Sequence, residues 1–298
     1  MYFIYPHKET ELTNLERQDT FGWLLSVESF LAGAGAGAFL FGFVYNLFEQ
    51  YQLIGKIGMV VGISLVIIGV VLLFLELGRK KRFYMVAFNA SSWIARGSWF
   101  ITIFIVFGLI YLSSGYLGYL DIESIVVKGI GVIAALSAVF VMSYTGFLFG
   151  AAKRIPLWNA SGLPMLFFFS SLYTGKAIIL LIAAFVETTT TEALRSLVIA
   201  GLILILLQMI ALGTFLGTAA YGGTTVSESV RFLLKNPLFV NLVIVFGLLI
   251  PLGLLGYLVV MNKGFMLSVP ACILLLIGGL YLRHGILRAG LRLQVTAF

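Results

Sequence analysis

The sequence predicts an all-α fold: a polytopic membrane protein whose eight transmembrane helices form a bundle. Hydrophobic residues make up 61% of the 298 residues and charged residues only 10%, whereas a soluble domain carries about a quarter charged residues. Apolar runs recur along the chain at the length of about 20 residues that a helix needs to cross a bilayer. Backbone groups in hydrocarbon must find their hydrogen bonds within the element, which favours helices over open strands.

The predicted spans follow one another with short connections, and nothing between them is long enough for a soluble domain. We therefore expect residues 1–298 to form a single integral membrane domain. Residues 1–21 are a polar tail of mixed charge, unlike a signal peptide, in which an apolar core follows a positive start. The eight spans are predicted at residues 22–48, 54–77, 92–117, 125–152, 163–186, 194–221, 238–261 and 265–284.

Small residues and a proline predict how two of these spans are shaped. In the first span, residues 33–38 alternate Gly and Ala, and Gly33 and Gly37 have the spacing that lets a neighbouring helix approach closely. No Lys-Ser or Lys-Thr follows this run, so it is not a nucleotide-binding loop. In the seventh span, Pro251 predicts a kink.

Lysine and arginine residues predict the orientation of the chain. An even number of spans places both termini on one side, here called the terminus side; the opposite side is the far side. Thirteen basic residues fall on the terminus side, including the cluster Arg79–Arg82, and four fall on the far side. This bias predicts a multi-pass protein of the cytoplasmic membrane with both termini in the cytoplasm. The net charge of +7 mostly reflects this asymmetry and needs no nucleic-acid partner.

Metal-binding residues are scarce. The protein has one cysteine, Cys272, and two histidines, His7 and His284. An iron–sulfur cluster takes about four ligands, and a bis-histidine haem needs a facing histidine pair within the membrane. We therefore expect no metal site, no haem and no iron–sulfur cluster in this protein.

Polar side chains inside the spans point to a binding site. Glu28 lies near the start of the first span, where burial of a carboxylate costs a few kcal/mol or more. Ser92 and Arg96 begin the third span, Tyr144 lies late in the fourth, and Lys176 lies in the middle of the fifth. Except for Lys176, these residues belong to the terminus side, and the far half is expected to be almost wholly apolar. This pattern favours a pocket open to one side that holds the polar head of an amphipathic molecule.

Each of these residues also has a purely structural interpretation. Glu28 would form an ion pair with Arg96 or Lys176, since buried charges are normally paired. Arg96 lies close enough to the headgroups to extend its side chain to them. Tyr144 alone carries little information, because tyrosines are common near membrane interfaces. Lys176 is too deep to reach the headgroups, so it is expected to face the protein interior.

Four segments together resemble one known family, the NrfD/polysulfide-reductase membrane subunits, which are quinone-interacting integral membrane proteins. Each segment alone is a weakly specific match, but the segments occur in the order found in the family and span nearly the whole chain. They are residues 23–38; 77–79 with 91–99; 144–148 with 155–159 and 163–167; and 278–283 with 289–290.

The resemblance implies an eight-helix subunit that oxidises quinol or reduces quinone of the menaquinone or ubiquinone type. Its electron partner would be a ferredoxin-like iron–sulfur subunit, in a respiratory complex with a catalytic subunit of the molybdo/tungsto type or another redox subunit. Relatives hold the quinone head through polar residues early in the first span and a tyrosine late in the fourth, which correspond to Glu28 and Tyr144. Ser92, Arg96 and Lys176 complete the expected quinone site.

The residue at the first-span position departs from the family pattern. Relatives carry His or Asn where this protein has Glu28. It is therefore open whether this group donates a hydrogen bond, takes the quinol proton, or does both.

Two other classes of function remain as alternatives. A secondary transporter or small-solute permease would need polar groups reaching both faces of the bundle. A membrane anchor without quinone chemistry would have no evident need for the buried polar residues. Co-purification of a cluster-bearing protein and a bound quinone would separate these interpretations from the quinone-binding one.

Overall fold

A computed structural model describes residues 15–17, 22–76, 92–117, 124–186, 191–261 and 264–293 of the protein. Within these ranges, eight helical stretches are long and apolar enough to cross a membrane, which confirms the predicted fold class. The first six are α1 (Trp23–Asn46), α2 (Gln52–Glu76), α4 (Trp93–Leu117), α5 (Ile125–Gly150), α6 (Leu163–Phe185) and α7 (Thr191–Ala220). The seventh joins α9 (Pro237–Phe239), the π-helix η5 (Val240–Leu249) and α10 (Ile250–Met261), and the eighth is α11 (Ser268–Arg288).

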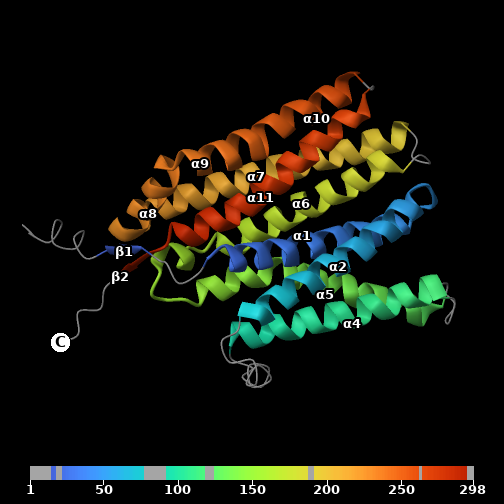
Figure 1. Ribbon diagram of the computed structural model, residues 1–298, viewed down its shortest axis with the longest axis horizontal. Helices are drawn as coiled ribbons and strands as arrows, with labels where there is room; N and C mark the ends of the chain where they lie inside the picture. Colours follow the sequence, from blue (N-terminus) through green and yellow to red (C-terminus); the bar gives the residue numbers. More distant parts are fainter. Residues whose placement is uncertain are drawn as a thin grey trace, which may run out of the picture.

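Helix α1 lies in the interior of the bundle (Figure 1) and contacts α2, α5, α6 and α11. Helices α4 and α5 pack together along one edge, and α7 and α10 pack along the other. Among the eight spans, α1 and α6 are buried over the largest share of their length, and α4 over the smallest. A polar residue on α1 or α6 is therefore surrounded by protein, whereas one on α4 often faces the lipid.

Close approach of α1 to its neighbours depends on glycine. A methyl group on Gly37 would lie 3.2 Å from Cα of Gly175 on α6, and closer still to the Ser171 carbonyl oxygen. On another face of α1, a methyl group on Gly35 would lie 2.6 Å from the carbonyl oxygen of Gly62 on α2. The small-residue run thus serves helix packing, as its spacing predicts.

The seventh span is irregular just before its proline. Pro251 has no N–H group with which to continue an α-helical ladder, and it is the second residue after the π-helical stretch η5. Within η5, Gly247 faces Gly278 of α11: a methyl group on Gly247 would lie 2.7 Å from the Gly278 Cα. The break in helical register therefore lies where this span packs tightly against the eighth.

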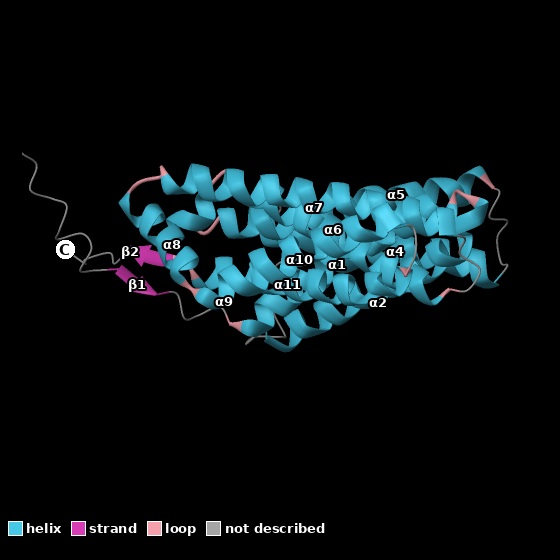
Figure 2. Cartoon of the chain, turned by 90° about the horizontal axis from the view of Figure 1, so that it is seen from above, coloured by secondary structure: helices cyan, strands magenta, loops and turns pink. Residues whose placement is uncertain are grey.

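Four short elements on the terminus side were not predicted, one of them the 3₁₀-helix η4 (Pro156–Asn159) between α5 and α6. Helix α8 (Thr224–Lys235) lies in the connection between the sixth and seventh spans and buries Val226, Val230 and Leu233. Strands β1 (Leu15–Arg17) and β2 (Leu291–Leu293) form an antiparallel pair in which Leu15 is opposite Leu293 (Figure 2). This pairing joins a segment of the polar tail to the residues just after α11, so both ends of the bundle's sequence meet on one side.

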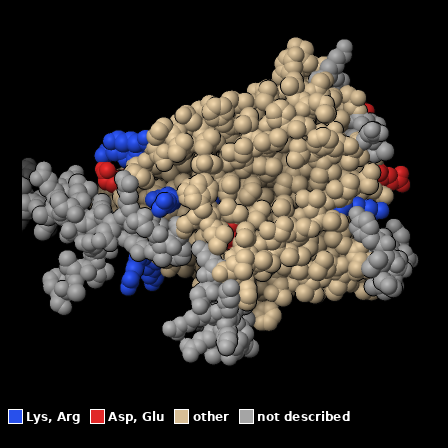
Figure 3. All heavy atoms as spheres, viewed as in Figure 1, with Lys and Arg blue, Asp and Glu red and all other residues tan. Residues whose placement is uncertain are grey.

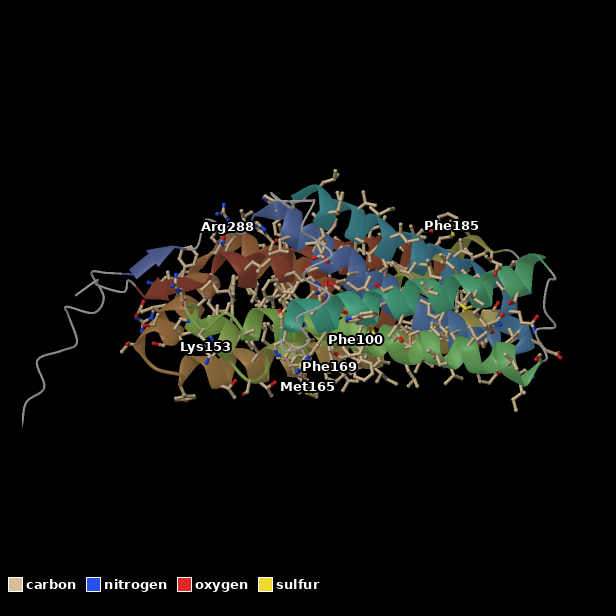
Figure 4. The ribbon with its side chains drawn as sticks, turned by 90° about the horizontal axis from the view of Figure 1, so that it is seen from below. Phe100, Lys153, Met165, Phe169, Phe185 and Arg288 are labelled. Carbon is tan, nitrogen blue, oxygen red and sulfur yellow. The ribbon has the colours of Figure 1, made fainter. Side chains whose placement is uncertain are left out.

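Charged residues gather at the two ends of the helices. On the face drawn in Figure 3, Lys and Arg side chains cluster at the end that carries α8, and a largely uncharged belt separates the two ends. Figure 4 shows Lys153 and Arg288 toward the terminus side and Phe185 toward the far side. Two sequence features, the basic cluster at residues 79–82 and the aromatic-rich loop at 83–90, lie outside the described residues.

Candidate functional site

Glu28 and Tyr144 meet on the terminus side of the bundle. Glu28 is the sixth residue of α1 and is 2% exposed, since α1 is enclosed by other helices along its length. The Tyr144 hydroxyl, on α5, donates a hydrogen bond of 2.8 Å to Glu28 Oε1. A hydrogen bond to an ionised acceptor is stronger than a neutral one and contributes ~1.5–3 kcal/mol. Residues 116 positions apart thus form one donor–acceptor pair.

Glycine on α4 makes room for the Tyr144 ring. A methyl group on Gly97 would lie 2.9 Å from Cε2 of Tyr144, and even nearer to Cδ2. The ring is therefore held between α5 and the first turns of α4, and Tyr144 is buried. Since α4 is the least enclosed span, the pair lies one helix away from lipid.

Arg283 is a third member of this site, and our sequence reasoning missed it. Its side chain is 1% exposed, deep between α11, α5 and α6. Nη2 donates to Ser171 Oγ at 2.7 Å, Nη1 donates to Thr145 Oγ1 at 3.3 Å, and the guanidinium carbon lies 4.7 Å from the Phe167 ring centroid.

The Arg283 guanidinium is electrostatically linked to the Glu28–Tyr144 pair. It lies close enough to the Glu28 carboxylate and to the Tyr144 and Tyr173 hydroxyls to interact with them electrostatically. Gly33, on α1, leaves the space that the guanidinium fills, because a methyl group there would overlap Nη2. Opposite charges therefore share one buried region, which lowers the cost of holding either of them in the membrane.

His284 connects α11 to the start of α1. Its Nδ1 lies 3.1 Å from Ser26 Oγ, and its ring stacks on Trp23 with centroids 3.7 Å apart. Both rings line a cavity of about 430 Å³ that is also bordered by Arg288 and Asn236. Neither Glu28 nor Tyr144 lines this cavity.

Ser92 and Arg96 lie at the start of α4, nearer the surface. The Ser92 hydroxyl accepts a hydrogen bond of 3.3 Å from the Ile94 N–H, as a residue that caps a helix does. Arg96 is exposed, and its guanidinium carbon lies 4.9 Å from the Trp93 ring centroid. Trp93 in turn stacks on Phe147 and lines a second cavity, of about 290 Å³, between α4, α5 and α6.

Lys176 is buried, as predicted, but it lies far from Glu28. Its Nζ donates to the Tyr45 hydroxyl and lies over the rings of Tyr45 and Phe41. Tyr45 is seventeen residues beyond Glu28 on α1, which is about 25 Å along a helix axis. The structural interpretation that pairs Glu28 with Lys176 is therefore wrong.

The far half, expected to be almost wholly apolar, contains a small group of hydroxyl-bearing side chains. Tyr45 and Tyr51 have ring centroids 5.3 Å apart, and the Tyr51 hydroxyl lies 2.6 Å from Ser196 Oγ. Tyrosine and serine are common in membrane spans and do not by themselves indicate a polar cluster. These three residues also come from three separate segments of the protein. The sequence alone therefore did not indicate that they lie near Lys176.

Among the residues that the structure describes, no group of three or more His, Cys, Asp or Glu side chains is placed to hold a metal ion. Cys272 and His284 lie twelve residues apart on α11, about 18 Å along its axis, so these two residues do not form a ligand set. The chemistry of the described site is that of hydrogen-bonding and proton-accepting groups.

Comparison with known proteins relates this sequence to one family. Residues 11–295 match the sequence model of the family described as "Polysulphide reductase, NrfD". The protein is 27% identical to "Protein NrfD" of Escherichia coli (strain K12) over 187 residues, which cover 54% of this sequence and 59% of that protein. It is 27% identical to the C subunit of the polysulfide reductase of Wolinella succinogenes over 173 residues, covering 51% of this sequence and 55% of the other. The matched regions thus span somewhat more than half the length of these relatives.

Proposed function

The chain belongs to the NrfD polysulphide reductase family, and from this premise we propose that it is the quinone-binding membrane subunit of a multi-subunit oxidoreductase. The observation that carries the proposal is the buried hydrogen bond between Tyr144 and Glu28, with the Arg283 guanidinium close by. It combines a hydroxyl donor, a proton-accepting carboxylate and a fixed positive charge within an apolar bundle. A quinone headgroup, with two ring oxygens that gain or lose protons, needs these three functions.

The proposed chemistry assigns one role to each side chain. Quinol oxidation releases two electrons, which leave to the electron partner, and two protons. Glu28 accepts the proton of the ring hydroxyl nearest to it, and the second ring hydroxyl releases its proton to water. Tyr144 turns its hydroxyl from Glu28 to the quinone oxygen and donates a hydrogen bond to it. Arg283 favours the anionic forms that arise during the transfer, because a positive charge in a low-dielectric site acts strongly on nearby charge.

The electrons require a partner, for which we propose a ferredoxin-like iron–sulfur subunit. The described part of the protein offers no cluster ligands, and the Glu28–Tyr144 pair lies toward the terminus side. An electron acceptor docked on this side would be the nearest one to the quinone. A catalytic subunit of the molybdo/tungsto type, or another redox subunit, would complete the complex, and the quinone is of the menaquinone or ubiquinone type.

Two conservative variants test the proposal in the complex isolated from membranes. Glu28→Gln keeps the shape of the side chain and removes its proton affinity, and Tyr144→Phe removes only the hydroxyl. We expect each to lower quinone-linked turnover by roughly 10²-fold, as is typical for loss of a general acid or base, while the complex still assembles. The measurement is the steady-state rate with a soluble quinone analogue, together with the yield of intact complex.

Tyr257→Phe provides the matched control. This tyrosine lies on α10 with half of its side chain exposed, away from the terminus-side pair, so losing its hydroxyl should leave the rate unchanged. Full quinone-linked activity in Glu28→Gln would remove the proton-accepting role of Glu28. Unchanged affinity for quinone in Tyr144→Phe would exclude this tyrosine from the site.

A further inference from the structure

The cavity beside Trp23 and His284 has no role in the proposed quinone site. Its volume of about 430 Å³ falls within the range of ~300–1,000 Å³ that small-molecule sites occupy. Four elements surround it: the start of α1, the end of α8, α9 and the last turns of α11. Since α1 and α11 both have their terminus-side ends here, the cavity lies where the spans meet the lipid headgroups.

One wall of the cavity is aromatic. The Trp23 ring stacks on His284 and meets the Tyr281 ring edge-on, with the centroids of the latter pair 5.4 Å apart. Trp23 is 45% exposed, so this wall faces outward instead of filling the core. Tryptophan and tyrosine rings favour the headgroup depth of a membrane, because they combine an apolar body with a polar tip.

Hydrogen-bond donors give the cavity a preference for anions. Arg288 is exposed at the terminus-side end of α11 (Figure 4) and is close enough to His284 to interact with it electrostatically. Asn236 Oδ1 accepts a hydrogen bond of 3.0 Å from the Leu238 N–H, which leaves the amide N–H groups of Asn236 as donors. Lys235, next to Asn236, is a second exposed cation. The described residues that line the cavity include no Asp or Glu, so nothing acidic offsets Arg288 there.

An apolar stripe leads from the cavity into the membrane. On α11, Ile273 and Ile277 precede Tyr281 and His284 at intervals of four, four and three residues, which places these side chains on one face of the helix. Ile273 is 46% exposed and Ile277 is 39% exposed, so both belong to the lipid-facing surface. The stripe covers about 16 Å along the helix axis. A molecule held in the cavity can therefore extend apolar chains along α11.

We propose that this cavity binds the headgroup of an anionic glycerophospholipid. The phosphate accepts charge-assisted hydrogen bonds from Arg288 and from the amide of Asn236, and the acyl chains follow Ile277 and Ile273. A neutral quinone head would gain less from Arg288, since a hydrogen bond to an ionised acceptor is about twice as strong as a neutral one. The bound lipid joins α8 and α11 to the start of α1, five residues before Glu28. This inference does not depend on the proposed quinone chemistry.

Native mass spectrometry of the full-length protein tests the lipid site. The protein is purified in a neutral detergent, freed of lipid, and titrated separately with dioleoylphosphatidylglycerol and with dioleoylphosphatidylcholine. We expect one phosphatidylglycerol per protein chain to bind more tightly than phosphatidylcholine. A third titration uses sn-glycerol 3-phosphate, which carries the phosphate without acyl chains and should not be retained.

Arg288→Gln removes the cation from the cavity. The affinity for phosphatidylglycerol should fall roughly fivefold or more, and the affinity for phosphatidylcholine should stay the same. Arg154→Gln is the matched control, because Arg154 is an exposed arginine of the terminus side that does not line this cavity. Its affinity for phosphatidylglycerol should equal that of the wild type.

Leu238→Glu tests the same cavity with Arg288 left in place. The Leu238 side chain is 60% exposed and lines the cavity, so a carboxylate at this position should repel the phosphate and lower the affinity for phosphatidylglycerol. Leu47→Glu places the same charge at the C-cap of α1 on the far side, where the wild-type side chain is 65% exposed. This control should bind phosphatidylglycerol as the wild type does.

Equal affinities for the two lipids would overturn the inference, as would an unchanged affinity for phosphatidylglycerol in both Arg288→Gln and Leu238→Glu. Retention of sn-glycerol 3-phosphate as tight as that of phosphatidylglycerol would assign the cavity to a free phosphate instead of a lipid. Displacement of bound phosphatidylglycerol by a quinone analogue would assign it to quinone and contradict the inference too. Loss of the proposed role of Glu28 alone would leave the lipid site standing.

Discussion

At the scale of single residues, the central feature is how three polar side chains are kept inside an apolar bundle. Glu28 accepts the hydrogen bond of Tyr144, and Arg283 lies near enough for its charge to act on both. Glycines at positions 33 and 97 leave room for the Arg283 guanidinium and for the Tyr144 ring. The site therefore depends on the absence of a side chain at these two glycines as well as on the three polar residues.

Arg283 gives a prediction at this scale. Arg283→Lys keeps a positive charge but loses the planar fork that reaches Thr145 and Ser171 together. We expect quinone-linked turnover to fall by about tenfold, with the complex still assembled, because the charge is no longer held in one position. Steady-state kinetics with a quinone analogue check this.

A matched control makes the same exchange of arginine for lysine at a position outside the site. Arg231→Lys changes an exposed arginine on α8 that pairs with Glu228, and it should leave turnover unchanged. If Arg283→Lys turns over quinone at the wild-type rate, the fixed geometry of Arg283 plays no part in the reaction.

Sequence reasoning identified two of these three residues. Glu28 stood out because a carboxylate early in an apolar run is rare, and the family resemblance added Tyr144. Arg283 was counted among the basic residues that flank the spans, since it lies within a few residues of the end of α11. An arginine at that depth usually extends to the headgroups, and only the fold shows that this one turns inward.

At the scale of elements, the helix contacts of α1 decide where Glu28 points. Gly37 packs against α6 and Gly35 against α2, and a helix held on two faces cannot rotate freely. These contacts therefore fix the rotation of α1 about its axis, and with it the direction of Glu28. The site is therefore sensitive to changes in packing well away from it.

Gly37→Ala should destabilise the protein. The added methyl group would overlap the Ser171 carbonyl oxygen, which belongs to the backbone of α6 and cannot move independently. Overpacking of this kind costs ~1–3 kcal/mol, which lowers the melting temperature by about 2–10 °C. Cys272 is the only cysteine and is buried, so a thiol-reactive dye reports unfolding directly.

Gly213→Ala is the control for this measurement. Nothing lies within 4 Å of a methyl group at Gly213 on α7, so the melting temperature should stay equal or rise slightly, because Ala favours helix. Equal melting temperatures for the two variants would contradict the packing role of Gly37.

The eight spans were predictable because length and hydropathy alone define them. Helix α8 was not, because its sequence mixes polar and apolar residues over Thr224–Lys235 and forms no apolar run. Its stability comes from burying Val226, Val230 and Leu233 against the bundle. These apolar residues stand at the i, i+4, i+7 spacing of an amphipathic helix, a pattern that our search for long apolar runs did not use.

At the scale of the whole molecule, the bundle has a terminus side and a far side of different character. The terminus side carries the Glu28–Tyr144 pair, α8 and the β1–β2 pair, and the far side carries the contact between Tyr51 and Ser196. The strand pair joins two segments near the ends of the sequence, in keeping with an even number of spans. We propose that the terminus side faces the cytoplasm, as the distribution of basic residues predicts.

Single cysteines test this orientation. In a Cys272→Ala background, Glu49→Cys places a thiol at an exposed far-side position and Lys153→Cys places one at an exposed terminus-side position. A membrane-impermeant maleimide applied to intact cells should label the first and not the second. The reverse pattern would place both termini, and the proposed electron partner, outside the cytoplasm.

The most direct test of the central claim is a structure of the complex with a quinone analogue bound. We predict that a ring oxygen of the quinone lies within hydrogen-bond distance of Tyr144 and Glu28, with the Tyr144–Glu28 hydrogen bond broken to receive it. A quinone head seated instead in the cavity between Trp23 and His284, with the Tyr144–Glu28 bond intact, would contradict it.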